Sequence, residues 1–411
     1  MAAAWRMRVL STAGRIILEN GGETYRAEDT VLRMGKALGL KEIGVFAIPS
    51  GLFISFVDEA DEPNTSVTRI HLQGTHLRRV DRVNHISRQL ANGEIQPGDV
   101  LEGLRQAESL DEASPVWYSP LTAFLTAAFF AVMFGGGPVD MFIGGLCAAI
   151  AQIVPLLWKQ AGIAGGLMGS VFCALIPLWF HAVSGLGNPD AMIAASIMPL
   201  VPGLSMTNAV QDILRGDMMS GVAYAARAVM MAALIAGGAL IGTHLFRFTG
   251  LQSPAVVEVS MPFWLEVLVI FISSTLAGAS FGSFLYAPGK AILWGGLLGG
   301  VGYTASWLTL EAGASNAVAM FLGAFIASVG AQWAARRLKM ITTLFITIAI
   351  LPMVPGLGLY RAMSAVAQGL TGQGLAIAAS TMAAILMIAL GIGCGSQLAL
   401  IPRRGEHEGR G

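Results

Sequence analysis

The sequence is short of charged side chains. Only 12% of its 411 residues are Asp, Glu, Lys or Arg, whereas soluble globular proteins average about 25%. This deficit excludes an ordinary water-soluble fold for the whole chain. The formal net charge is zero, with 25 basic and 25 acidic residues. There is thus no basic excess of the kind that favours nucleic-acid binding, and we expect no nucleic-acid partner.

Cysteine is also scarce. The three cysteines, Cys147, Cys173 and Cys394, stand far apart within apolar runs. Their spacing fits neither a metal site nor an even-numbered disulfide framework, so we interpret them as small core residues. The N-terminal part of the chain also has no phosphate-binding loop and no nucleophile elbow. The sequence therefore predicts no cofactor, no metal and no enzymatic activity.

The charges that are present are unevenly distributed. Residues 1–115 hold 29 of the 50 charged side chains, whereas residues 116–402 hold only 16. The first segment has the charge density of a soluble protein and the second is strongly apolar. We therefore predict a small soluble cytoplasmic domain (residues 1–115), a membrane domain, and a cytoplasmic tail (residues 403–411).

The apolar part divides into ten segments, each about long enough to cross a bilayer as a helix. Many of the 51 glycines punctuate or line these segments, as expected where helices pack closely in lipid. The ten predicted spans are 118–135, 139–157, 162–183, 190–211, 218–245, 263–284, 290–309, 313–334, 341–360 and 373–400.

Basic residues in the short loops predict the orientation, because cytoplasmic loops are enriched in Lys and Arg. With a cytoplasmic N-terminus, only Arg247 and Arg361 fall outside. We therefore expect a multi-pass protein of the bacterial inner (plasma) membrane with both termini in the cytoplasm. The inside residues are Lys159, Arg215, Lys290, Arg336, Arg337, Lys339, Arg403, Arg404 and Arg410.

One motif occurs twice. Met198-Pro-Leu-Val-Pro-Gly-Leu204 recurs 153 residues later as Leu351-Pro-Met-Val-Pro-Gly-Leu357, and Gly144-Gly-Leu recurs 151 residues later. The near-constant offset predicts a duplicated unit of five helices, in residues 116–260 and 261–402. Because five is odd, the second unit would enter from the opposite side. This inverted 5+5 repeat is typical of secondary transporters.

The repeated motif should break its helix. Two prolines remove backbone donors and displace carbonyls, and such a break is tolerated in a bilayer only against protein or a water-filled cavity. Matching breaks in two halves point to a transport site, although two structural kinks are the alternative. The candidate substrate-binding residues at the breaks are Pro199, Pro202, Gly203, Pro352, Pro355 and Gly356.

Polar residues near the breaks extend this candidate site. Asn208 and Arg361 lie six residues beyond the second proline of each motif, so the two are possible counterparts. Asp212 is either a site residue or part of a cytoplasmic helix end. Arg227 lies deep in the fifth predicted span, where an ionisable residue is a functional candidate by default. Amide, hydroxyl and cationic groups together suit a small zwitterion or a carboxylate.

Residues 1–115 read as a small α+β domain. Amphipathic spacing and turn residues predict two helices, three strands and two more helices. A dense polar run, Glu23-Thr-Tyr-Arg-Ala-Glu-Asp29, begins the second helix, where acidic side chains suit a solvated helix start. The predicted helices are 5–19, 24–38, one that Thr75 caps, and 97–109; the predicted strands are 41–48, 51–58 and 67–72.

These motifs together resemble the threonine/serine exporter family over nearly the whole chain. Residues 20–29, Asn-Gly-Gly-Glu-Thr-Tyr-Arg-Ala-Glu-Asp, are similar to its N-terminal signature, in which a small residue and a glycine precede Glu-Thr-x-Arg-x-Glu. Residues 45–52 resemble the strand–turn–strand that follows, and both Pro-x-x-Pro-Gly breaks match. The signature residues are Glu23, Thr24, Arg26 and Glu28.

The resemblance implies a function. It implies export of threonine and serine driven by the proton motive force, with protons as the coupling ion and the bilayer as the environment. Some relatives split into two proteins and are associated with export of dicarboxylates such as succinate, which is the alternative. A membrane-anchored hydrolase and a channel are further alternatives. Homo-oligomer formation stays open.

Overall fold

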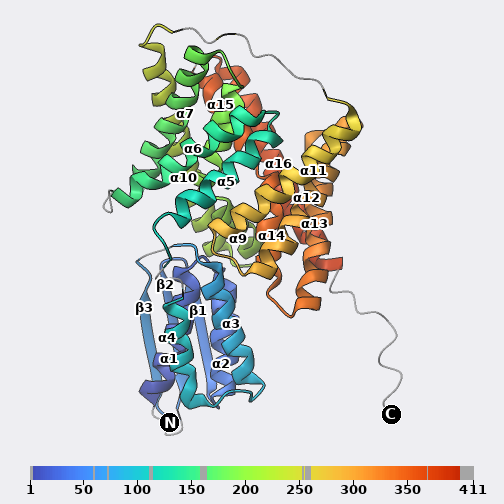
Figure 1. Cartoon of the computed structure of the whole chain (residues 1–411). Coiled ribbons are helices and arrows are strands. Elements are labelled where there is room, and N and C mark those ends of the chain that lie inside the picture. The colour runs from blue at the N-terminus through green and yellow to red at the C-terminus, as the bar shows by residue number, and fades with distance from the viewer. Residues whose placement is uncertain are drawn as a thin grey trace. The chain divides into compact units, whose positions relative to one another are not determined.

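The computed structural model describes residues 3–58, 61–71, 74–110, 114–157, 164–251, 254, 261–367 and 369–398. It is mostly helical and contains one three-stranded sheet (Figure 1). The chain forms two compact units, which we describe separately. Unit 1 comprises Met1–Val116, Pro202–Met230 and Leu285–Pro288, and unit 2 comprises the rest. The predicted loop residue Lys159 and the predicted tail 403–411 lie outside the described residues.

The N-terminal part of unit 1 contains helices and strands. An amphipathic first helix buries Val9, Ala13 and Ile16 on one face, at the spacing of helical turns. The elements are α1 (Ala3–Glu19), α2 (Thr24–Ala37), β1 (Lys41–Ile48), β2 (Gly51–Val57), β3 (Pro63–Arg69), α3 (Leu77–Ala91), a 3₁₀ turn η1 (Pro97–Asp99) and α4 (Val100–Glu108).

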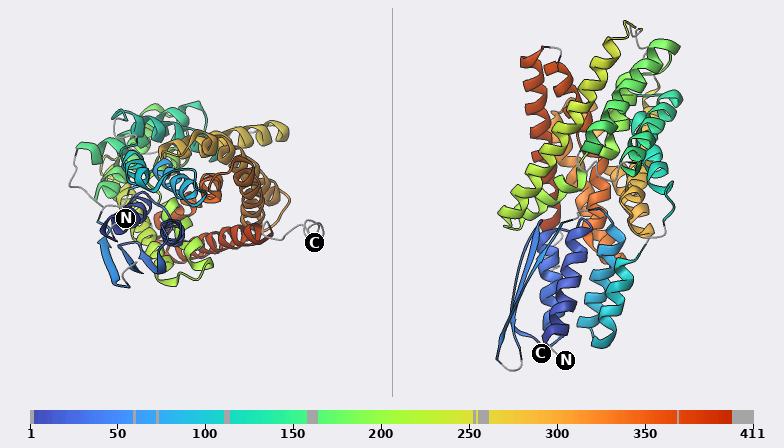
Figure 2. Two further views of the ribbon diagram at one scale, coloured as in Figure 1. Left: turned by 90° about the horizontal axis from the view of Figure 1, so that it is seen from below. Right: turned by 90° about the vertical axis from the view of Figure 1, so that its left-hand side faces the viewer.

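The sheet is antiparallel, in the order β1-β2-β3. Its helices lie on one face (Figure 2), where Leu52, Ile54 and Phe56 of β2 are buried. The other face is open, and there Phe46 pairs across the strands with Phe53, which pairs with Val67. The alternation of side chains along a strand explains this division.

The third strand differs from its prediction. Sequence analysis expects it at residues 67–72, but it spans Pro63–Arg69. The register explains the shift, because Val57 pairs with Pro63 and Gly51 with Arg69. This edge strand has mostly polar side chains, so a search for apolar residues misplaces it.

Two further segments complete unit 1: α9 (Gly203–Leu214) with the first half of α10 (Met218–Arg247), and the connection Leu285–Pro288. The connection caps α3. The backbone N–H groups of Leu77 and Arg78 donate to the carbonyls of Leu285 and Tyr286, at 3.1 and 2.9 Å. The first N–H groups of a helix have no partner within it, and these carbonyls satisfy two of them.

Unit 2 contains only helices in the part that the structure describes. Small side chains line many of its contacts, for example Ala123, Ala127 and Ala148 between α5 and α6. The elements are α5 (Tyr118–Met133), α6 (Pro138–Leu157), α7 (Ala164–Ser184), α8 (Pro189–Ile197), η2 (Met198–Leu200), the second half of α10, α11 (Phe263–Phe284), α12 (Gly289–Glu311), α13 (Asn316–Leu338), α14 (Thr342–Ile350), η3 (Leu351–Met353), α15 (Gly356–Ala367) and α16 (Thr371–Leu398).

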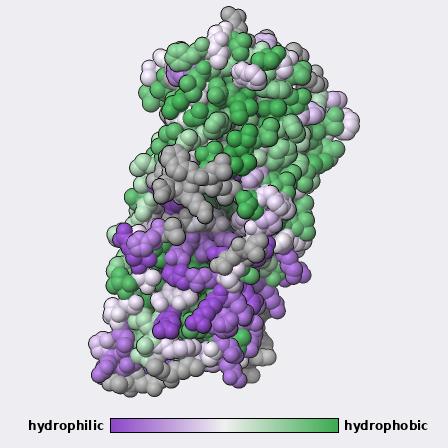
Figure 3. Space-filling view, turned by 60° about the vertical axis from the view of Figure 1, so that its left-hand side comes forward, coloured by the Kyte–Doolittle hydropathy of each residue, from purple (hydrophilic) through white to green (hydrophobic). Residues whose placement is uncertain are grey.

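The helices have the length and surface of a multi-pass membrane protein. Within the described residues, five are long and apolar enough to cross a bilayer, or six if the bent pair Pro189–Leu200 and Gly203–Leu214 counts as one span. Three more apolar helices are shorter. Large hydrophobic side chains cover the exposed helical surface (Figure 3). The expected number of ten spans stays a prediction.

Glycine permits the closest of these helix contacts. Gly238 of α10 lies so close to α7 that an added Cβ would collide with the Ser170 hydroxyl and the Leu167 carbonyl. Its neighbour Gly237 faces open space, with no atom within 4 Å of such a Cβ. Close backbone approach at small residues is how helices associate in lipid.

This difference generates a prediction. Gly238→Ala should destabilise the protein by about 1–3 kcal/mol, because the backbone carbonyl of Leu167 cannot move aside cheaply. Gly237→Ala is the matched control and should be neutral or stabilising by up to about 1 kcal/mol, from its better helix propensity. Thermal unfolding of the purified variants in detergent measures both. Equal melting temperatures for the two variants would contradict the packing described here.

Candidate functional site

One face of α9 is polar and buried. Thr207, Asn208, Gln211 and Asp212 are all shielded from solvent in this structure. They recur three and four residues apart, so they lie on one side of the helix. A buried polar face is costly unless its groups find partners, and unit 1 supplies some of these partners from the N-terminal part of the chain.

The partner is a turn between α1 and α2, formed by residues 20–23 and here named the double-glycine turn. Gly21 has a positive φ of 86°, which glycine adopts without strain. An added Cβ there would lie 2.6 Å from Cδ2 of Leu204 on α9. Glycine therefore both makes the turn and lets it approach the helix.

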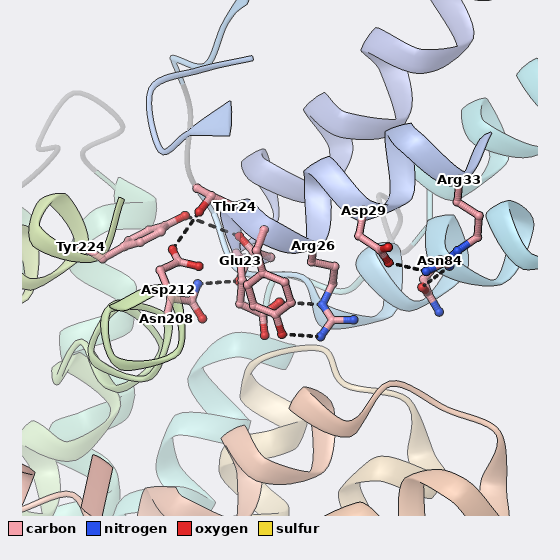
Figure 4. Close-up of polar contacts among 12 residues, drawn as sticks. Glu23, Thr24, Arg26, Asp29, Arg33, Asn84, Asn208, Asp212 and Tyr224 are labelled. Carbon is pink, nitrogen blue, oxygen red and sulfur yellow. Dashed lines mark hydrogen bonds and ion pairs between the residues drawn. The ribbon is translucent and has the colours of Figure 1, made fainter. Parts of the chain in front are cut away.

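Three hydrogen bonds join this region to α9 and α10 (Figure 4). The Thr24 hydroxyl donates to Oδ2 of Asp212 at 2.9 Å. The Asn208 side-chain amide donates to the Gly21 carbonyl at 3.0 Å, and the Tyr224 hydroxyl lies 3.5 Å from the Gly22 carbonyl. Residues about 190 positions apart in the chain thus form one polar cluster.

Two polar atoms of this cluster have no partner among the described residues. They are Oδ1 of Asp212 and Nε2 of Gln211, both buried. Asp212 has no solvent exposure at all, and no cation of the described chain lies within ion-pair distance of it. Unsatisfied buried polar groups are rare in native proteins and call for an explanation such as a missing ligand, water or proton.

A second network lies beside this cluster. Nε of Arg26 binds Glu23 at 2.7 Å, and Nη2 donates to the Tyr25 hydroxyl at 3.1 Å. The guanidinium of Arg215 stacks on the Tyr25 ring at 4.1 Å, a cation–π contact. Burial and the adjoining Glu23 raise the pKa of Tyr25 to about 12. Burial acts to lower the pKa of Arg26, but Glu23 and Tyr25 outweigh it and the pKa is raised.

Glu28 has a structural position. Its Oε1 accepts the Ala47 backbone N–H at 2.7 Å and so joins α2 to β1. Burial raises its pKa, against the effect of this hydrogen bond. Of the signature residues, Glu28 therefore connects elements of the N-terminal domain, whereas Glu23, Thr24 and Arg26 lie in or beside the polar cluster.

The two proline breaks have the expected backbone. Each is a three-residue 3₁₀ turn, η2 at Met198–Leu200 and η3 at Leu351–Met353, followed by an extended residue before the next helix. Within unit 2 the breaks meet: a Cβ on Gly356 would lie 2.6 Å from Sδ of Met198 and 3.6 Å from Cγ2 of Val201. Pro199 and Pro352 are buried.

The remaining predicted site residues lie as follows. Pro202, Gly203, Asn208 and Asp212 belong to unit 1, as does Arg227, which is half-buried in α10. Pro355 and Arg361 belong to unit 2, and Arg361 is exposed. Sequence reasoning missed Tyr224 and the contact of the double-glycine turn, although Asp212 itself was a candidate. The signal in the sequence that could have indicated this contact is the glycine pair Gly21-Gly22, directly before the polar run that begins at Glu23.

Comparison with known families identifies the chain. Residues 8–246 match the family model described as "Putative threonine/serine exporter", and residues 270–397 match the one described as "Threonine/Serine exporter, ThrE". The chain belongs to the threonine/serine exporter family. The resemblance predicted from residues 20–29 and from the two breaks is confirmed, and the chain is a membrane transporter by family.

Two relatives align over most of the chain and a third over half of it. The threonine/serine exporter of Corynebacterium glutamicum is 25% identical over 97% of this chain and 83% of its own length. The probable threonine/serine exporter of Mycobacterium tuberculosis is 22% identical over 92% of this chain and 73% of its own. The probable succinate transporter subunit YjjP of Klebsiella aerogenes is 26% identical over 50% of this chain and 81% of its own. No solved structure matches this chain.

The cluster predicts different roles for two buried threonines of α2. Thr24→Val removes the hydrogen bond to Asp212 and should cost about 1–3 kcal/mol. Thr30→Val is the matched control: the Thr30 hydroxyl is buried without a partner among the described residues, so its loss should be neutral or stabilising. Thermal unfolding in detergent compares the two. If Thr30→Val were the more damaging change, the Thr24–Asp212 contact would not stabilise the protein.

Proposed function

We propose that this chain exports threonine and serine across the bacterial inner membrane in exchange for protons, and that it is not an enzyme. The observation that carries the proposal is the buried polar cluster on α9, directly after a proline break. Relatives that cover nearly the whole chain are named threonine/serine exporters. Polar groups buried on broken membrane helices are where transporters bind substrates and coupling ions.

We further propose that the membrane part is an inverted repeat of five helices, 116–260 and 261–402. The elements around the breaks support it, because the second set follows the first at a constant offset of 153 residues. The series α8, η2, α9 begins at positions 189, 198 and 203, and the series α14, η3, α15 begins at 342, 351 and 356, with identical lengths of 9, 3 and 12 residues.

Packing within each half supports the same repeat. An added Cβ on Gly242 of α10 would lie 2.5 Å from the Val171 carbonyl of α7. The residue 153 positions later is Gly395 of α16. An added Cβ there would lie 3.0 Å from the Phe325 carbonyl of α13. Helices at the same offset are therefore in contact, and the contacted carbonyls differ by one position, because the counterpart of Val171 is Ala324. An odd number of crossings would make the two units run in opposite directions.

We propose that both termini face the cytoplasm. This orientation follows from the excess of Lys and Arg in alternate short loops. Under it the N-terminal domain and the end of α9, near Arg215, are cytoplasmic. Threonine and serine in the cytoplasm would then reach the polar cluster from their own side of the membrane.

The charge of the cluster favours an amino acid over a dicarboxylate. Glu23 is acidic and buried, and an anionic substrate would be repelled by its carboxylate at close range. A zwitterion carries an ammonium group that such a carboxylate attracts, and hydroxyl groups of the substrate suit the amide of Asn208. Export of succinate, suggested by the printed names of half-length relatives, is the second candidate.

The deciding experiment is counterflow in proteoliposomes that contain the purified full chain. Vesicles preloaded with unlabelled threonine, serine or succinate are diluted into a trace of the labelled compound. We expect exchange of threonine and serine and none of succinate. Succinate exchange alone would replace the first proposal with the second, and uptake without a preloaded counter-substrate would indicate a channel.

The breaks generate a prediction within this assay. Pro202→Ala and Pro355→Ala should each lower threonine exchange by about tenfold or more, because a small displacement of site residues is costly. Pro177→Ala is the control, since Pro177 is a proline inside α7 and outside both break motifs. Expression and detergent elution profiles check folding. Normal exchange in both break variants would show that the breaks are structural kinks.

A further inference from the structure

We propose that Asp212 binds the coupling proton, and that its neutral form holds the double-glycine turn against α9. This inference rests on the proposed proton-coupled export. It assigns to Asp212 the role of a proton-binding residue instead of a substrate ligand. Three features of the residue carry the argument: its environment, the charges around it, and its absence from the second half.

The environment of Asp212 disfavours a negative charge. Its side chain has no solvent exposure, and Oδ1 has no hydrogen-bond partner among the described residues. Asp212 also lies in the last turn of α9, which ends at Leu214. The carbonyl end of a helix is the negative end of its dipole. A buried carboxylate without a compensating cation is costly, whereas the neutral acid costs much less.

The neighbouring charges act in the same direction. Glu23, before α2, and Asp217, after α9, are both acidic and within electrostatic range of Asp212. The nearby cations are engaged by other groups: Arg26 binds Glu23 and Tyr25, and Arg215 stacks on Tyr25. The titratable and charged groups around Asp212 on these elements and on α10 are Glu23, Tyr25, Arg26, Arg215, Asp217, Tyr224 and Arg227.

The hydrogen bond from Thr24 couples this proton to the N-terminal domain. In the observed arrangement, here called closed, residues 20–24 contact α9. Thr24 donates to Oδ2 of Asp212, and the proton forms an O–H bond at Oδ1. Release breaks that O–H bond and passes the proton to water, which leaves a carboxylate. Solvation of this anion requires water to reach a site that the double-glycine turn covers. Loss of the proton therefore favours separation of residues 20–24 from α9.

The second half lacks this group. At the repeat offset of 153 residues, the position of Asp212 corresponds to Ala365, and that of Asn208 corresponds to Arg361. Ala365 is buried but cannot titrate. The proton-binding residue is therefore a feature of the first half alone, where the N-terminal domain contributes to its surroundings.

The experiment compares efflux of labelled threonine from proteoliposomes with and without a pH gradient. In the full-length wild-type protein, acidifying the outside should accelerate efflux by about tenfold. Asp212→Asn keeps the shape and removes the titratable group, so we expect symmetrical exchange to persist while the gradient has no effect. Asp190→Asn, at an exposed acid in the first turn of α8 and outside the polar cluster, is the control and should keep its response.

The outcomes separate this inference from the proposed function. Absence of threonine or serine exchange in the wild type would refute the proposed function and with it this inference. A full gradient response in Asp212→Asn would overturn this inference and leave export intact. Equal loss of exchange and of the gradient response would assign Asp212 to substrate binding or structure, and would also overturn it.

A second measurement needs no transport assay. Hydrogen exchange of the wild-type protein, read by mass spectrometry between about pH 6 and pH 8, reports opening of the closed contact. After correction for intrinsic rates, peptides from residues 19–26 and 203–214 should lose protection as the pH rises, whereas Gly51–Val57 should not. The same peptides in Asp212→Asn should stay protected. Protection of residues 19–26 that is independent of pH in the wild type would overturn the inference.

Discussion

A carboxyl group buried without a cation must hold a proton or reach water, and the first half of this protein is arranged around one such group. Asp212 is covered by a turn that only glycine allows to come so close, since Gly21 has a positive φ and adjoins Leu204. Thr24, the first residue of α2, donates to the covered oxygen. The contact of the N-terminal helices with α9 thus includes this polar interaction, and the space that glycine leaves permits it.

The proline breaks place that group. A continuous helix would satisfy its own backbone, but here α8 ends at Ile197, η2 contains Pro199, and α9 begins at Gly203 directly after Pro202. The new helix therefore presents its own face, with polar residues three and four positions apart. The break at residues 198–203 in this way sets where α9 begins and thus which of its side chains share a face. On the buried face, Asp212 and Asn208 form hydrogen bonds with Thr24 and Gly21.

The sequence predicts local features well and long-range ones poorly. The breaks at Pro199 and Pro352 were predictable, because proline and glycine impose backbone limits wherever they occur. The strand at Pro63–Arg69 was misplaced because its register is set by pairing with β2 and not by its own composition. The contact of Thr24 with Asp212 joins residues 188 positions apart, and no periodicity reports such a pairing. Arg361 was a site candidate by spacing, and that role stays a prediction; its side chain is exposed.

The division of the family agrees with this physical account. One family model covers residues 8–246 and the other covers residues 270–397, so the N-terminal domain belongs with the first group of membrane helices. The polar cluster lies entirely within the first of these segments. The proposed duplication would supply a helical scaffold in both halves, whereas the residue 153 positions after Asp212 is an alanine, Ala365. The double-glycine turn covers Asp212, so its contact with α9 can respond to the proton on that carboxyl group. The second half has no titratable side chain at the equivalent position.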